Sequence, residues 1–160
     1  MTTILKRVSA VIVLCLTSSM GYSNSEVEGL SPELRKLLGK EMLALQEGMK
    51  AIIPAYTSGD LEEVARIAEK MKSSYIIKQN ITREQKRELK SKMPKSFLHR
   101  DQTFHKQAGM LEHVAEENHT ELVGFYFYKL VESCAGCHSQ YATHKFPSFT
   151  KEKPEHKHHH

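Results

Sequence analysis

The chain is 160 residues long, a length that fits one domain. With three cysteines, no tryptophan, 26% charged residues and a formal net charge of +4, its composition excludes a disulfide scaffold, an acidic disordered tail and a multipass membrane protein.

The N-terminus has the layout of a secretory signal peptide. A basic start at Lys6 and Arg7 leads into the apolar run 8–16 and then into small and polar residues. Gly21 and Ser23 supply the small residues that signal peptidase needs, so we expect cleavage near Ser23 and export to a Gram-negative periplasm. The apolar run is too short to span a bilayer, so we expect no membrane span in the mature chain. Cys15 is then removed with the leader.

The predicted mature chain is close to neutral. Removing residues 1–23 takes away two positive charges and leaves a net charge of +2. So small a positive charge does not indicate a nucleic-acid-binding protein. From Ser31 onward apolar residues recur at helical spacing, and no window alternates as a strand would. We therefore expect a helical domain over residues 24–146 and a flexible, His-rich tail over 147–160.

The first two expected helices are long and amphipathic. One opens at Ser31, with proline at its first helical position, and continues to Tyr56. Its inward stripe consists of Leu34, Leu38, Met42, Leu45, Met49, Ile52, Ile53 and Tyr56. The next helix is capped by Asp60, with Glu63 as the reciprocal partner, and runs to about Gln79.

A short surface helix is expected next. Thr82 and Gln85 form a capping-box pattern, the following residues are mostly charged, and Pro94 ends the run near Met93.

Two further long helices complete the domain. The third long helix covers residues 95–117, and Asn118 is the expected cap of the last one, whose apolar residues lead into Cys134. Four long amphipathic helices with short connections predict an all-α, antiparallel four-helix bundle.

The chemically informative run is Cys-x-x-Cys-His at the end of the last helix, the attachment motif of c-type haem. At 100° per residue, Cys134, Cys137 and His138 fall within about 100° of arc, so two thioether bonds and one iron ligand reach the same porphyrin. One covalent haem c is the expected cofactor, with the two cysteines as anchors and His138 as proximal iron ligand. The apolar residues upstream on that face are Val123, Phe127, Leu130 and Val131.

Three other interpretations of the motif are less favoured. A thioredoxin-like pair would lie at a helix start after a strand, whereas this pair ends a helix. A zinc site would add His138, His144 or the tail histidines to the two cysteines, but a second cysteine pair is absent from the sequence. A disulfide between residues three apart would be strained and would leave the histidine unexplained.

The position of the motif narrows the class of c-type cytochrome that the sequence predicts. The commonest small cytochromes carry the motif near the N-terminus, whereas here it lies at the end of the last expected helix. Over about residues 34–146 the chain resembles the cytochrome c′ family, periplasmic four-helix bundles with haem bound near the C-terminus. One departure follows the motif: Tyr141 matches the family's aromatic residue, but Ala142 stands where many members have Arg or Lys. His144 and Lys145 are the candidate substitutes.

The resemblance also bears on the sixth iron position. The axial methionine of Met-ligated members matches Met42, which the pattern places on the inward stripe of the first helix. A thioether ligand keeps iron low-spin and raises its potential, which suits electron transfer. Met49 is the second choice, and core filling is the alternative role for either. If no methionine binds, the resemblance implies a five-coordinate iron that binds or senses small gases such as nitric oxide.

Other residues are weaker candidates. His105 is a candidate for the haem pocket, and Arg35, two turns before Met42, for a propionate contact. The basic run 83–95 is expected to be a solvated face that could steer an acidic redox partner. The remaining helical histidines, expected at the surface, are His99, His113 and His119.

Together these features predict a periplasmic c-type cytochrome that carries single electrons and is not an enzyme, since no nucleophile and base pair or other cofactor fingerprint is visible. A gas-binding haem protein and a non-haem, zinc-binding helical protein are the alternatives. The sequence does not identify the redox partner, and a homodimer is compatible with it.

Overall fold

The structure, a computed structural model, describes residues 26–150. The expected signal peptide, its cleavage site and the histidines from position 156 onward lie outside the described residues. Within the described part, no helix combines the length and apolarity needed to cross a membrane.

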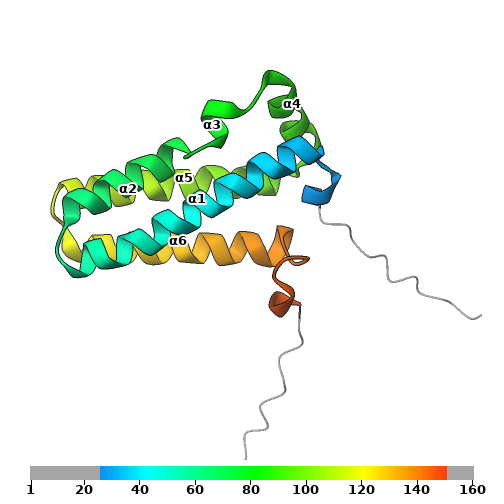
Figure 1. The fold of residues 1–160 in the computed structure, drawn as a ribbon. Helices are drawn as coiled ribbons and strands as arrows, with labels where there is room; N and C mark the ends of the chain where they lie inside the picture. Colours follow the sequence, from blue (N-terminus) through cyan, green and yellow to red (C-terminus); the bar gives the residue numbers. More distant parts are fainter. Residues whose placement is uncertain (1–25, 151–160) are drawn as a thin grey trace, which may run out of the picture.

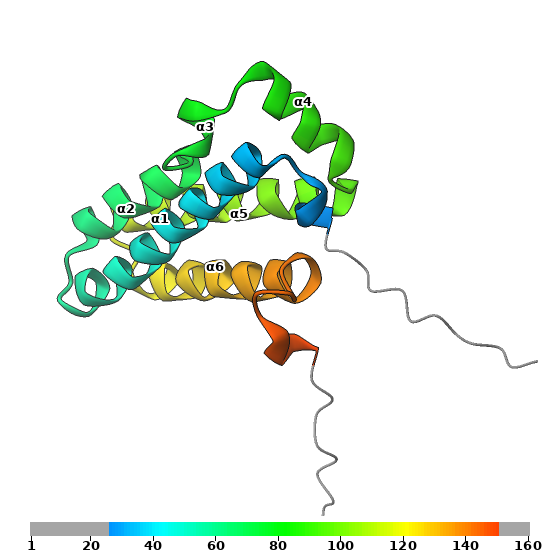
Figure 2. The ribbon, with the colours of Figure 1, turned by 45° about the vertical axis from the view of Figure 1, so that its right-hand side comes forward.

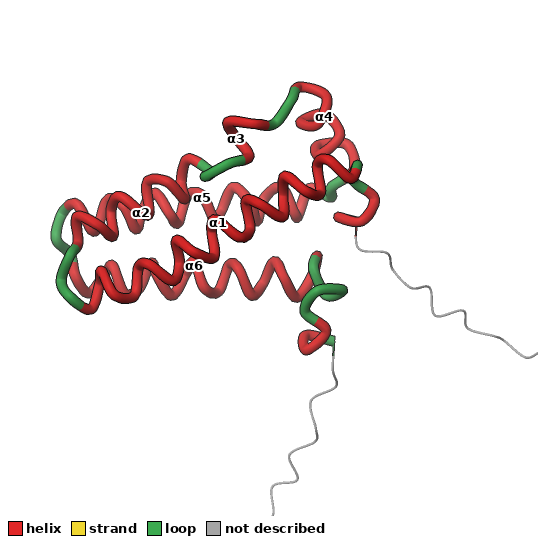
Figure 3. The backbone as a smooth tube through the Cα atoms, viewed as in Figure 1, coloured by secondary structure: helices red, strands yellow, loops and turns green. Residues whose placement is uncertain are grey.

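Every regular element of residues 26–150 is helical, which confirms the all-α prediction (Figure 1). The elements in chain order are η1 (Glu26–Gly29), α1 (Pro32–Thr57), α2 (Leu61–Ser73), α3 (Ile77–Asn80), α4 (Arg83–Lys92), α5 (Lys95–Glu116), α6 (Thr120–Tyr141) and η2 (Pro147–Phe149). Helix α5 packs against both α2 and α6, and α1 packs against α2. The connections between the helices are short (Figure 3).

Two apolar clusters hold these helices together. The larger one joins α1, α2, α5 and α6, and its fully buried side chains include Ile52, Met71, Leu111 and Leu130. The smaller one lies where α4 meets the start of α1, around Leu34 and neighbouring apolar residues. Figure 2 shows α4 standing at that end, away from the connection between α1 and α2.

Helix α2 ends at Ser73, six residues before the predicted end at Gln79. The reason is a buried carboxylate on α1. Glu41 is 3% exposed and accepts hydrogen bonds from the backbone N–H groups of Tyr75, Ile76 and Ile77, at 2.9, 2.6 and 2.9 Å. These amides are thereby satisfied outside a continuous helix, while Ser74 adopts a φ of 59°. The local sequence pattern predicts a longer α2 because it contains no sign of Glu41, which lies 34 residues before Tyr75.

The predicted caps are confirmed in part. Thr82 and Gln85 form both bonds of the capping box. Asp60 accepts from the backbone of Glu63 at 3.0 Å, whereas the Glu63 carboxylate pairs with an arginine one turn on. Asn118 is not the cap of α6: with a φ of 58° it reverses the chain after α5, and the next residue precedes α6.

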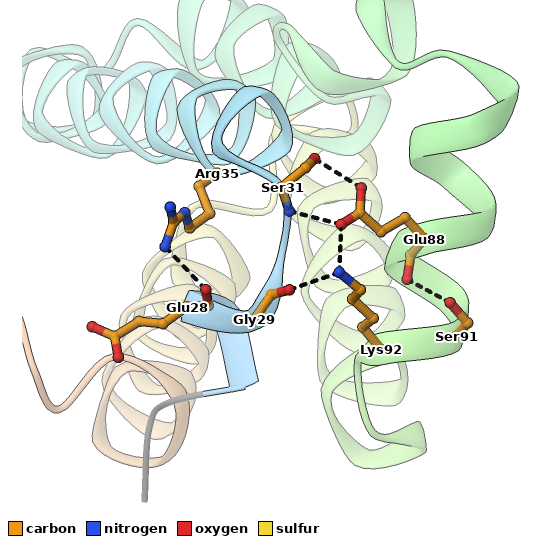
Figure 4. A network of polar contacts seen from close by, with 7 residues as sticks. All are labelled: Glu28, Gly29, Ser31, Arg35, Glu88, Ser91 and Lys92. Carbon is orange, nitrogen blue, oxygen red and sulfur yellow. Dashed lines mark hydrogen bonds and ion pairs between the residues drawn. The ribbon is translucent and has the colours of Figure 1, made fainter.

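A polar network ties α4 to the start of α1 (Figure 4). The Glu88 carboxylate accepts from the backbone N–H and the hydroxyl of Ser31, at 2.7 and 2.8 Å. Lys92 donates to the carbonyl of Gly29 at 2.8 Å and pairs with Glu88 at 3.0 Å. The bonds from Lys92 and Ser31 lower the pKa of Glu88. Ser31 therefore acts as an anchor rather than as a side-chain cap of α1.

The buried carboxylate of Glu41 gives a stability prediction. Changing Glu41→Ala leaves three backbone N–H groups without their partner, so we expect the free energy of unfolding to fall by about 2–4 kcal/mol in urea titrations. Glu47→Ala, which removes an exposed carboxylate from the same helix, should change it by less than about 0.5 kcal/mol. Equal effects of the two substitutions would contradict the role assigned to Glu41.

Candidate functional site

The motif lies in the last two turns of α6, which remains helical through Tyr141. Cys134 and Cys137 are free thiols and are half-buried. Burial raises the pKa of both thiols. Dithiol redox centres instead use a helix N-terminus to lower the pKa of the attacking thiol, so both the position and the electrostatics differ from a thioredoxin-like site.

His138 points toward the segment that follows α6. Its ring is half-buried and stacks on Phe146, with ring centroids 4.4 Å apart and an interplanar angle of 12°. Burial lowers the pKa of His138, which favours the neutral imidazole, the form that binds metal ions. The chain turns back through Ala142, whose carbonyl accepts from the Phe146 N–H at 3.0 Å. Residues 147–149, predicted as part of the flexible tail, form η2.

Helix α5 fixes the rotation of α6 around the motif. Ser133 donates to Gln107 at 2.6 Å, and the buried Tyr141 donates to Ser96 at 2.7 Å. The Tyr141 ring also meets Phe97 edge-on, at 5.2 Å. The aromatic residue expected after the motif thus anchors α6 to the first turn of α5.

Arg100 of α5 is a neighbour of the motif that the sequence reasoning missed. A Cβ atom built on Gly136 would lie 3.1 Å from Nη1 of Arg100, so the guanidinium lies over the residue between the two cysteines. It is also close enough to lower the pKa of Cys137, against the larger effect of burial. His144 and Lys145, the expected cationic substitutes, are exposed. Antiparallel pairing of the last two helices is the sequence signal that could have pointed to Arg100.

The placement of Met42 on the buried stripe is wrong. Its side chain is 44% exposed, while the stripe is formed by Leu34, Glu41, Leu45 and neighbouring residues. The reason is angular: Met42 lies about 60° around the helix from Leu45, on one flank of the stripe. The second-choice ligand, Met49, is half-buried and packs against the core.

A contact of Tyr56 with α6 relates the levels of residues along α1 and α6. The hydroxyl of Tyr56 donates to the carbonyl of Thr120 at 2.9 Å and lies 3.0 Å from a Cβ built on Gly124. Met42 is fourteen residues before Tyr56, and His138 is fourteen residues after Gly124. Fourteen residues make nearly four turns and about 21 Å, so Met42 and His138 lie at about the same level along the two helices.

The ribbons of α1 and α6 diverge toward the end that carries the motif (Figures 1 and 2). Of the apolar residues expected along the motif's face, Val123 and Leu130 are buried in the core. Phe127 is half-buried and Val131 is 44% exposed. Phe127 and Val131 therefore place apolar groups on α6 beside the motif. Met42 places an apolar group on α1.

The remaining candidates lie elsewhere. Arg35 is exposed and donates to the carbonyl of Glu28 at 3.0 Å. His105 belongs to the contact between α5 and α2: its Nδ1 lies 2.9 Å from the Met71 carbonyl, and its Nε2 lies 3.6 Å from Asp101. The exposed histidines are His99, His113 and His119. Within residues 26–150, no three His, Cys, Asp or Glu side chains gather as a metal-ion site.

The position of His105 gives a pH dependence. The neighbouring Asp101 carboxylate raises the pKa of His105 above its ordinary 6.5, against the effect of burial. Protonated His105 therefore stabilises the fold, fully below pH 6.5 and less as the pH rises through the folded-state pKa. We expect the stability advantage of the wild type over His105→Gln to be largest below about pH 6.5 and to shrink as the pH rises above that value in urea titrations. An advantage that grows with pH would contradict this sign.

Comparison with known proteins adds no family to this description. No protein-family model, curated protein or solved structure matches the chain. The resemblance to cytochromes c′ stays a prediction from the sequence motif and its place at the end of the last long helix.

Proposed function

We propose that the chain is a periplasmic c-type cytochrome that transfers single electrons. Cys134 and Cys137 would hold one haem through thioether bonds, His138 would bind the iron on one side, and Met42 on the other. The observation that supports the proposal is the register of α1 and α6, in which Met42 and His138 have about the same level along the two helices.

The donor set fits a haem. Both thiols are free, and α6 keeps its helical path from Cys134 through His138, so the two sulfurs and the imidazole share one side of the helix. The apolar side chains of Phe127 and Val131 continue along α6 beside them. We propose further that α1, α2, α5 and α6 form an antiparallel four-helix bundle, with the haem between α1 and α6.

Bound haem supplies a one-electron iron couple. The chain's own residues set the conditions for it. The two thiols anchor the cofactor, and the half-buried imidazole is neutral at pH 7 and available as a ligand. The Met42 thioether is a soft, uncharged ligand that favours the ferrous state. Apolar side chains on α1 and α6, among them Met42 and Val131, would contact the faces of a haem bound between these helices.

A second candidate function follows from the exposure of Met42. A side chain that is 44% exposed is not held in one place by packing, and an iron without a sixth protein ligand binds small gases. Gas binding and electron transfer share the covalent haem and differ in spin state. A zinc-binding protein would differ from both in lacking haem.

The experiment that tests the cofactor uses the full chain, exported in a host with the haem-attachment machinery. We expect haem to remain with the protein after acid extraction, with one haem per chain. Cys134→Ser/Cys137→Ser should lose covalent haem, whereas Ser133→Ala, next to the motif, should retain it. Extractable or absent haem in the wild type would contradict the cytochrome assignment and favour zinc.

The distal ligand is tested by a matched pair of methionine substitutions. Met42→Ala should convert most of the iron from low-spin to high-spin and allow carbon monoxide to bind, without loss of the haem, because one axial ligand is removed. Met49→Ala should leave the spectrum low-spin, although the loss of its core packing should lower the free energy of unfolding by about 2–4 kcal/mol. A wild-type spectrum in Met42→Ala would show that Met42 is not the ligand, and a high-spin wild type would favour gas binding.

A further inference from the structure

We propose that the end of the molecule formed by α4 and the first half of α5 is the docking surface for an acidic electron-transfer protein. The surface comprises the exposed cations Arg83, Lys86, Lys90, Lys95 and Arg100. This proposal rests on the proposed function, since it names the kind of protein that would exchange electrons at the motif.

The two ends of the molecule differ in charge. From residue 83 to residue 106 the chain has eight arginine and lysine side chains against three carboxylates. From residue 107 to residue 121 it has four glutamates and no arginine or lysine. Helix α5 begins within the basic segment and ends within the acidic one, so it links the positive end of the protein, which α4 completes, to the negative end. Such a separation orients an approaching acidic protein before contact.

The positive end is not neutralised by its own carboxylates. Glu84 pairs with Arg87, and Glu88 pairs with Lys92. Among residues 26–150, no carboxylate forms an ion pair with any of the five cations of the docking surface. All five are exposed, so their charges remain available to a partner.

The positive end adjoins the motif. Arg100 lies over Gly136, between the two cysteines, and Tyr141 is bonded to Ser96 in the first turn of α5. A protein docked on the N-terminal half of α5 would therefore lie beside Cys134, Cys137 and the cofactor they are proposed to hold.

Helix α4 is held firmly enough to present its charges in a fixed arrangement. Met93 is 4% exposed and packs in the smaller apolar cluster with Leu34. The Glu88 network joins α4 to Ser31 at the start of α1 (Figure 4). The charges on α4 and α5 consequently form one surface rather than two independent segments.

The test measures electron transfer from a reduced plant-type [2Fe–2S] ferredoxin, an acidic protein of low potential, to the oxidised haem protein. One electron leaves the ferredoxin cluster and reduces ferric to ferrous iron. In stopped-flow measurements, we expect the second-order rate constant to fall at least about tenfold between 10 and 200 mM ionic strength, because salt screens opposite charges. Reduction by hexaammineruthenium(II), a small cation, should not fall with salt.

Matched charge reversals locate the effect. Lys86→Glu/Lys90→Glu/Lys95→Glu should slow reduction by ferredoxin at least about tenfold at 10 mM ionic strength. Lys50→Glu/Arg66→Glu/Lys70→Glu, which makes the same change in net charge on α1 and α2, should slow it less than about threefold. Equal slowing by both variants would overturn the docking surface in favour of a net-charge effect.

A binding measurement separates the two hypotheses. Oxidised ferredoxin added to the isotope-labelled chain at low salt should shift the amide signals of residues 83–100, whether or not haem is attached. If the exported wild type carries no covalent haem but still shows these shifts, the proposed function is contradicted and the acidic-protein surface is retained. Covalent haem with no shifts there, or with rates indifferent to salt, would retain the cytochrome and overturn the surface.

Discussion

The arrangement of the molecule depends on one buried carboxylate. Glu41 accepts three backbone hydrogen bonds from the segment after α2, and this interaction ends α2 and sends the chain outward into α3 and α4. It also sets the rotation of α1. Because successive residues of a helix differ by 100°, burying Glu41 against the segment after α2 turns its neighbour Met42 away from that segment. The helix ending and the orientation of Met42 thus have one origin.

The helices were largely predictable because the information about them is local. Apolar periodicity, the Thr82 capping box and the turn chemistry near Pro94 are all read within a few residues of each other. The end of α2 was not predictable in this way, since the partner that satisfies its amides lies on another helix. The exposure of Met42 was not predictable from local sequence either. An apolar stripe on a helix is about 100° wide, and packing against other helices decides which of its two flanks is buried.

The residues of the candidate site also include some that local sequence predicts and some that only packing brings to the motif. The spacing of Cys134, Cys137 and His138 identifies them from sequence alone, because one helix carries all three. Arg100 and Phe146 reach the motif only through folding, one from α5 and the other from the turn that follows α6. Arg100 also supplies a cation near the motif, from a helix that the sequence pattern around the motif does not include.

The packing of the motif has a consequence for the order of events during biogenesis. In the folded chain both sulfurs are half-buried, the guanidinium of Arg100 lies over Gly136, and the imidazole of His138 is covered on one face by Phe146. An enzyme that joins a porphyrin to these sulfurs needs access to them from several sides. If the chain carries the proposed haem, its attachment should therefore precede the docking of α6 on α5, so that α6 would be modified as a separate segment and its docking would be the last step of assembly.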